Sequence, residues 1–483
     1  MTTTISEIKR FFSAKHIPAF VVGGYVRDAL NGRLSQDVDF VAECDTLTVG
    51  REISDFFGGT FVLLDKNNLV VRVIIPDPDW GKISVDISPM MGSIEKDLRK
   101  RDFTIDAMAL PVDDVDNLTW SDHVIDPLGG RRDLELGIIN AINDDIFISD
   151  PIRLIRAVRL SAYMEFGIDN RTSDLIRRDA HLLQLASGER IRDEFMSLLA
   201  FEYAKRYLNM LDELDLLCCI IPELRYTKGV EQPNEHFWDV FQHSVETVGA
   251  VDLLMDHCGS EDIGGMYKWN DEFKFYFDEP AGDNHSRRTL LKLGALLHDI
   301  GKPKTKVVED DGRTRFLGHS DLGAKMSSER LNSLRCSSKT KKNICGMVEH
   351  HLRPFQLAQD GDMPTSRAIY RYFRDLGDIA VEVLYLSLAD YRAAKGPLLD
   401  PVQWQQRIAS TDFVLTEGFL NGPIQNSPRL VTGYDLMDSF GLTPGPQVGI
   451  LLDHVKEAHA IGKVRTKKEA LTLARSKLCE NRG

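Results

Sequence analysis

The chain has 483 residues, which is too long for one hydrophobic core and implies roughly three or four domains. Hydrophobic residues make up 43% and charged residues 27%, so the composition excludes a disordered chain and is typical of a globular protein. The formal charge of -14 argues against indiscriminate polyanion binding, although local basic tracks remain compatible with it.

No apolar run approaches the roughly 20 residues that a membrane span requires, and the first residues lack the apolar core of a signal peptide. We therefore expect no membrane partner and a cytoplasmic location. The seven cysteines form no C-x-x-C pair. They indicate thiols in a reducing compartment and neither a disulfide framework nor a zinc ribbon.

The first motif is a strand followed by a glycine turn. Residues 5–16 predict an amphipathic helix, and the apolar run 20–22 predicts a buried strand that breaks at Gly23 and Gly24 before a short helix. Glycine has no Cβ to block a ligand, so such a turn lets a phosphate approach backbone N–H groups at a helix start. A plain turn is the alternative for this motif taken alone.

A second strand carries two acids. Side chains alternate along a strand, so Asp37 and Asp39 share one face while Val38 and Phe40 pack behind. Two neighbouring carboxylates after a phosphate turn suggest a divalent-metal site that handles a nucleoside triphosphate. A solvated strand edge is the alternative for the pair alone.

Further strands are expected at residues 60–64, 69–75 and 82–87, after a helix at 47–57. Together these elements predict a small mixed sheet with flanking helices. Asp86 near the end of the last strand is a candidate third carboxylate, with a cap or turn role as the equal alternative.

The sequence GGYVRD followed by DVDF resembles the catalytic signature of the polymerase β nucleotidyltransferase superfamily, in its tRNA nucleotidyltransferase and poly(A) polymerase branch. The resemblance implies that Asp37 and Asp39 are catalytic and hold Mg²⁺. It also implies that Gly23, Gly24 and Arg27 cradle the nucleotide phosphates.

Residues 97–110, DLRKRDFTIDAMAL, resemble the family motif R-R-D-F-T-I-N-A. Lys100 and Asp106 stand where Arg and Asn are commoner. The resemblance implies that Arg101 helps to hold the triphosphate and that Asp102 orients the nucleotide sugar. Residues 125–140 close the sheet domain and also match the family.

From residue 146 onward the pattern is helical for about eighty residues. Leu154, Val158 and Ala162 recur on one helical face, as expected for packing. Residues 153, 156 and 159 form a stripe of arginines on another face, which is either a solvated surface or a nucleotide-binding one.

The start of this helical region, SDPIR, resembles the family's E-D-x-x-R motif with Ser149 in place of the Glu. The resemblance implies that Asp150 and Arg153 hydrogen-bond the base edges of incoming CTP or ATP, because a carboxylate and a guanidinium offer opposite hydrogen-bonding patterns. Arg156 and Arg159 are taken with them as nucleotide-binding candidates. Glu189, Arg190 and Arg192 are expected to be structural or positioning groups.

Histidines gather in the next part of the chain, where residues 236–351 contain eight of the 13. One histidine on an apolar helix face is more often part of a core than a ligand. An adjacent His-Asp pair with several partners on separate segments is harder to explain by packing, because buried ionisable groups are costly unless they are paired or ligated.

This series resembles the HD superfamily of metal-dependent phosphohydrolases. The resemblance implies the ligand set His243, His298, Asp299 and Asp390. His319 with one of His350 or His351, of which His350 is taken, would extend it to two metals. The mixed ligands suit Mn, Ni, Fe or Co, with Mg possible, and Lys302 is a candidate phosphate contact.

The remainder, from residue 401, is expected to be helical, with a helix start at Thr432 or Gly433 and a breaker at residues 444–446. LVTGYDL and PGPQVG resemble the tail of tRNA nucleotidyltransferases, which implies a surface that grips the tRNA acceptor arm by shape and phosphates. A packing role is the alternative. The polar segment 259–288 is interpreted as an insertion without an assigned function.

The sequence thus predicts an α+β protein with four domains. These are a nucleotidyltransferase head (1–145), a helical neck that selects the nucleobase (146–225), an HD domain (226–400) and a helical tRNA-binding tail (401–483). The expected activity is addition of C and/or A from CTP and ATP to the 3′ end of tRNA, with HD phosphohydrolase activity. A poly(A) polymerase is one alternative. An HD phosphodiesterase or phosphatase whose head only binds RNA is another.

Overall fold

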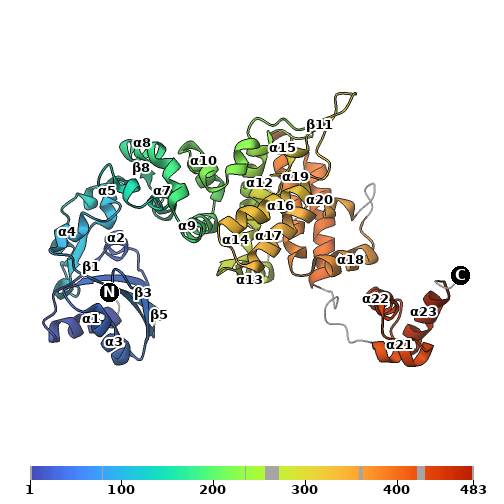
Figure 1. The fold of residues 1–483 in the computed structure, drawn as a ribbon, viewed down its shortest axis with the longest axis horizontal. Helices are drawn as coiled ribbons and strands as arrows, with labels where there is room; N and C mark the ends of the chain where they lie inside the picture. The colour runs from blue at the N-terminus through green and yellow to red at the C-terminus, as the bar shows by residue number, and fades with distance from the viewer. Residues whose placement is uncertain are drawn as a thin grey trace. The chain divides into compact units, whose positions relative to one another are not determined.

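A computed structural model describes residues 3–78, 80–233, 235–255, 271–357, 363–420 and 430–480. The chain divides into two compact units, Met1–Glu194 with Met210–Ile220 and Phe195–Asn209 with Ile221–Gly483 (Figure 1). The first unit contains a mixed sheet and helices, and the second is almost entirely helical. The predicted α+β class is confirmed, and the four domain boundaries stay predictions.

A six-stranded sheet forms the centre of the first unit. Its strands are β1 (Ala19–Val22), β2 (Asp37–Ala42), β3 (Thr60–Asp65), β4 (Val70–Asp77), β5 (Gly81–Pro89) and β6 (Ala109–Pro111). They lie in the order β3-β4-β5-β2-β1-β6, with β2 and β5 parallel and the other neighbours antiparallel. The sheet is therefore mixed, as predicted.

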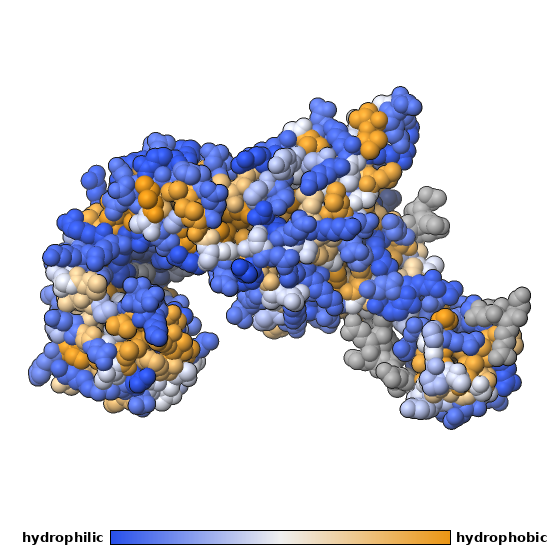
Figure 2. Space-filling view, viewed as in Figure 1, coloured by the Kyte–Doolittle hydropathy of each residue, from blue (hydrophilic) through white to orange (hydrophobic). Residues whose placement is uncertain are grey.

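Helices α1 (Thr3–Ala14) and α3 (Thr46–Phe57) cover one face of this sheet. Along β4 every second residue is buried, so Val71, Val73 and Ile75 join the core while their neighbours are more exposed. The edge strand β3 leaves Val62 and Leu64 exposed. Figure 2 shows that the visible face of the first unit carries hydrophobic residues among hydrophilic ones.

The rest of the first unit is mainly helical. Its helices include α2 (Gly24–Leu30), α4 (Ile94–Leu98), α5 (Gly130–Leu136), α6 (Ile146–Ser149), α7 (Arg153–Met164) and α8 (Asn170–Asp179), and α9 (Gly188–Ala200) and α10 (Ala204–Glu213) follow. Leu154, Val158 and Ala162 of α7 are buried, which confirms the predicted packing face.

The second unit is a bundle. Its helices include α12 (Val240–Met255), α14 (Arg287–Leu297), α16 (His319–Ser333), α17 (Ser338–His350), α18 (Ser366–Leu376), α19 (Ala380–Lys395) and α20 (Pro401–Leu415). Helix α12 packs on α14 and α19, and α16 packs on α17. The segment predicted as an insertion lies partly outside the described residues, and its described part forms α13 (Asp271–Asp278) and two short strands.

The last helices are α21 (Gly433–Phe440), α22 (Pro446–Ala460) and α23 (Lys467–Glu480), which share a small apolar core. Thr432 caps α21 and exchanges hydrogen bonds with Asp435 in a capping box, so the predicted helix start is confirmed. Among the described residues no helix combines the length and apolarity of a membrane span.

Candidate active site and metal centre

The two acids of the D-x-D motif lie on β2 of the central sheet. Val38 and Phe40 are each 1% exposed, whereas Asp37 is exposed and Asp39 is partly buried on the opposite face. The predicted alternation is therefore confirmed. Asp39 is in register with Val22, the last residue of β1, which places its carboxylate beside the start of the glycine turn.

The glycine turn meets an arginine from a distant motif. Gly23 has a φ of +68°, and a Cβ at this residue would lie 2.7 Å from Nη1 of Arg101 and 3.5 Å from Oδ2 of Asp39. The turn, the guanidinium and the carboxylate thus converge, and only glycine fits the turn without strain. Arg101 also lies 3.6 Å from a carboxylate oxygen of Asp97.

Asp86 is paired with Asp39 across the parallel strands, but it has its own cation. Nε and Nη2 of Arg72 lie 2.7 and 2.8 Å from its two carboxylate oxygens. Burial raises the pKa of Asp39, and the negative charge of Asp86 adds to this, against an opposing effect of Arg101. A nearby divalent cation would favour the ionised form of Asp39.

Arg27, predicted to contact phosphate, is buried within the protein. Its Nη1 lies 2.5 Å from Oδ1 of Asp106, its Nε donates to Asp28 at 2.9 Å, and its guanidinium stacks near the Tyr163 ring. Burial alone would lower the pKa of Arg27, but Asp106 and Asp28 outweigh it and raise the pKa. The phosphate role of Arg27 stays a prediction, and its guanidinium already has two carboxylate partners.

The other predicted arginines of α7 also have partners. Nε of Arg156 lies 2.8 Å from Oδ2 of Asp102, which links α7 to the motif that contains Arg101. Asp102 accepts a hydrogen bond from the backbone N–H of Phe103 at 3.0 Å. Arg159 pairs with Glu194 at 2.5 Å. Arg156 therefore adjoins the predicted sugar-binding carboxylate, whereas Arg159 pairs with a carboxylate of α9.

The predicted base-reading residues are close in sequence but bind different groups. Arg190 contacts both carboxylate oxygens of Asp150, with N–O distances of 3.0 and 2.7 Å. Arg153 instead donates to Oγ of Ser149 at 3.0 Å and to the backbone carbonyl of Lys100 at 3.1 Å.

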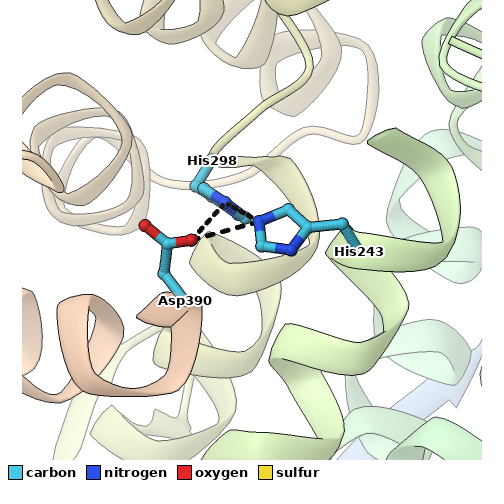
Figure 3. Close-up of side chains that lie close together, drawn as sticks. All are labelled: His243, His298 and Asp390. Carbon is cyan, nitrogen blue, oxygen red and sulfur yellow. Dashed lines mark hydrogen bonds and ion pairs between the residues drawn. The ribbon is translucent and has the colours of Figure 1, made fainter. Parts of the chain in front are cut away.

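A second cluster lies in the helical bundle, where His243 of α12, His298 at the C-cap of α14 and Asp390 of α19 point toward one another (Figure 3). Nε2 of His243 lies 3.2 Å from Nε2 of His298 and 3.1 Å from Oδ1 of Asp390. All three residues are buried. Two imidazoles and a carboxylate at these distances form a candidate divalent-metal site.

Asp299, His319 and His351 form an adjoining group. Nε2 of His319 lies 3.3 Å from Oδ1 of Asp299 and 3.3 Å from Nε2 of His351. Of the two neighbouring histidines, His351 is 1% exposed and lies in the group, whereas the predicted ligand His350 is the last residue of α17 and is not in it.

Hydrogen bonds of these rings favour metal binding. Nδ1 of His298, His319 and His351 lies 2.6 to 2.7 Å from a backbone carbonyl. A carbonyl only accepts, so Nδ1 of each ring donates to it, and Nε2 is the ring atom that faces the cluster. Oδ1 of Asp299 is buried and has no hydrogen-bond partner among the residues that the structure describes. The Nε2 atoms of these histidines and Oδ1 of Asp299 are therefore suitable ligands for a divalent cation.

Charge in this centre is also consistent with ligation. Burial lowers the pKa of His351 to about 4, so its ring is neutral at pH 7. Burial alone would raise the pKa of Asp299, but His298 and Lys302 hold it well below its usual range. Nζ of Lys302 lies 2.6 Å from Oδ2 of Asp299 and donates to Gln232 at 2.7 Å.

Comparison with known proteins covers nearly the whole chain. Residues 19–140 match the poly A polymerase head domain, 165–227 the "Probable RNA and SrmB-binding site of polymerase A", and 240–395 the HD domain. The A-adding tRNA nucleotidyltransferase of Deinococcus radiodurans is 32% identical over 458 residues, which are 94% of each chain. The chain belongs to the tRNA nucleotidyltransferase family.

Other members show the same relation. The CC-adding tRNA nucleotidyltransferase of Thermus thermophilus is 30% identical to this chain, over 94% of this chain and 92% of the relative. The solved Thermotoga maritima CCA-adding enzyme complexed with tRNA has a TM-score of 0.61 at 19% identity, covering 98% of this chain and 94% of that one. The likeness to this solved structure shows that the two proteins share a fold.

The sequence did not predict several side-chain ion pairs near the candidate site of this tRNA nucleotidyltransferase. Arg72 and Asp28 were not singled out, although they hold Asp86 and Arg27. A prediction of strand register could have found Arg72, because it stands opposite Asp86 on the neighbouring strand. No comparable signal existed for the contact between Arg27 and Asp106, which are 79 residues apart.

Proposed function

We propose that this enzyme adds C, A or both to the 3′ end of tRNA, using CTP and ATP and releasing pyrophosphate. The convergence of Gly23, Arg101 and Asp39 is the observation that supports it most directly. Relatives named as A-adding and CC-adding tRNA nucleotidyltransferases over 94% of the chain support the tRNA substrate. We also propose the cytoplasm as its compartment.

In the proposed reaction the RNA 3′-hydroxyl loses its proton to water, and its oxygen bonds to the α-phosphorus as the bond to the pyrophosphate oxygen breaks. Mg²⁺ at Asp37 and Asp39, when bound, supplies charge neutralisation of the triphosphate and a lower pKa for the RNA hydroxyl. Arg101 and the glycine turn meet the phosphates. Asp102 orients the sugar, and the Asp150 and Arg153 side chains bind the base edge.

Carboxylate removal tests this proposal. Asp37→Ala and Asp39→Ala should abolish incorporation of labelled CTP and ATP into tRNA while the circular dichroism spectrum stays unchanged. Asp55→Ala, which removes an exposed acid from the same head, should leave incorporation unchanged. Near-normal incorporation by the Asp39 variant would refute the assignment.

The number of nucleotides added is a separate question, because the relatives include A-adding and CC-adding enzymes. Three transcripts that end before CCA, after C and after CC, each offered CTP or ATP, distinguish the possibilities. The poly(A) polymerase alternative is not favoured by these relatives. It requires long tails on generic RNA, whereas the proposed enzyme stops after one to three additions.

For the bundle, we propose a metal-dependent phosphohydrolase that uses Mn, Ni, Fe, Co or Mg at the two histidine groups. Its proposed substrates are phosphoesters such as 2′,3′-cyclic or terminal phosphates on damaged tRNA ends. Phosphatase or phosphodiesterase activity with Ni²⁺ or Mn²⁺ that His298→Ala removes would support it. Absence of such activity in the native chain would make this bundle structural. The alternative of a head that only binds RNA is not favoured by the relatives.

The domain roles belong to the same proposal. Residues 1–145 form the transferase head, 146–225 the base-selecting neck, 226–400 the HD domain and 401–483 a tail that binds the tRNA acceptor arm. The two compact units of the structure are coarser than this scheme. A chain shortened at residue 400 should keep its nucleotide affinity and lose affinity for tRNA.

A further inference from the structure

Asp150 and Arg153, the proposed base-reading pair, differ in how their charges are balanced. Both oxygens of Asp150 face the guanidinium of Arg190, which projects from the first turn of α9. A fork that grips both oxygens defines the plane of the carboxylate as well as its position. Asp150 is therefore neutralised and oriented by a residue 40 positions away.

Arg153 is held in another way. Among the described residues its guanidinium donates three hydrogen bonds, to Oγ of Ser149 and to the backbone carbonyls of Ile146 and Lys100, at 3.0, 3.5 and 3.1 Å. All three acceptors are neutral. Within the part of the chain that the structure describes, Arg153 forms no ion pair with a carboxylate, so its positive charge remains available to a ligand.

Orientation of Asp150 matters for base selection. Cytosine and adenine both present an exocyclic N–H donor beside a ring nitrogen acceptor on the edge used for pairing. A carboxylate can accept from the first and a guanidinium can donate to the second. The two bases differ in size, so the position and plane of the carboxylate decide which of them satisfies both contacts.

We propose that Arg190 is a positioning residue for nucleotide selection, which holds the Asp150 carboxylate in the plane that the correct base requires. This inference rests on the proposed function, because it assigns base reading to Asp150. The proposal assigns Arg190 no direct contact with the nucleotide. Arg190 affects selection by fixing the orientation of Asp150.

The test compares four full-length proteins, the native chain, Arg190→Met, Arg190→Lys and Arg177→Met. Arg177 pairs with Asp174 at 3.0 Å on the exposed surface of α8, so its variant is a control for loss of a surface ion pair. For each protein, kcat/KM is measured for CTP, ATP, UTP and GTP on the three tRNA transcripts. Selectivity is the ratio between the correct and incorrect nucleotides.

We expect Arg190→Met to change this selectivity by roughly tenfold, the scale of one bidentate base contact. Arg190→Lys should give an intermediate change, because an ammonium keeps the charge without the fork. The control should keep the native ratio. If Arg190→Met does not fold, Arg190→Lys carries the comparison.

Two results have opposite meanings. Equal losses for all four nucleotides with an unchanged ratio would show that Arg190 is only structural and would overturn the inference. Failure of the native protein to extend any transcript would overturn the proposed function itself.

Discussion

Asp39 and Asp86 occupy paired positions on the neighbouring parallel strands β2 and β5, and Arg72 contacts both carboxylate oxygens of Asp86. Because Arg72 already neutralises Asp86, we expect Asp86→Asn to reduce transfer by less than about tenfold, in line with the small energy of a partly exposed ion pair. Asp39→Asn should abolish transfer. Mg²⁺ titrations of kcat/KM check this, and a raised Mg²⁺ requirement in Asp86→Asn would show that Asp86 is a third metal ligand.

Burial of Asp39 predicts a dependence of stability on pH. Its pKa is raised in the folded chain, so the folded state binds the proton more tightly and stability falls as pH rises above the unfolded pKa of about 3.9. In metal-free buffer at pH 7, Asp39→Asn should therefore unfold at higher urea concentration than the native chain.

The stability difference should disappear below about pH 4, where both states hold the proton. Added Mg²⁺ should stabilise the native chain more than the variant, because ligands stabilise the state that binds them. If the native chain and Asp39→Asn have the same unfolding midpoint at pH 7 as well as at pH 3, the predicted pKa effect is contradicted.

Arg27 is expected to contribute chiefly to stability. It is 7% exposed, and Arg27→Met would leave the buried carboxylates of Asp28 and Asp106 without their cation. We expect a loss of about 3–5 kcal/mol in the free energy of unfolding of the first unit. Arg33→Met, which removes a less buried guanidinium beside the same Tyr163 ring, should cost only about 1 kcal/mol.

Urea unfolding and nucleotide KM values distinguish the two roles of Arg27. A stable Arg27→Met protein with a greatly raised KM for CTP and ATP would instead support the phosphate contact predicted from the sequence.

The neighbouring histidines His350 and His351 form a matched pair for metal analysis. Only His351 lies in the group with Asp299 and His319. His351→Ala should therefore lose about one bound Ni²⁺ per chain relative to the native protein, whereas His350→Ala should lose none. Elemental analysis of the dialysed proteins measures this, with unchanged nucleotide transfer as the check on folding. Metal loss in the His350 variant alone would reverse the assignment.

Local patterns in the sequence were sufficient for several parts of this protein. Asp37 and Asp39 share a face because side chains alternate along any strand, and Val38 and Phe40 are buried behind them for the same reason. The cap at Thr432 and the buried face of α7 likewise depend on a few adjacent residues. The mixed sheet followed by helices could therefore be predicted.

Other features were decided only by the tertiary structure. Successive residues in a helix differ in direction by about 100°, so His350 and His351 point in different directions, and the packing of α17 decided which of them joins Asp299 and His319. Arg190 reaches Asp150 from 40 residues away, and Arg27 meets Asp106 across 79. Such pairs depend on how distant segments pack, and neither spacing nor periodicity in the sequence encodes that packing.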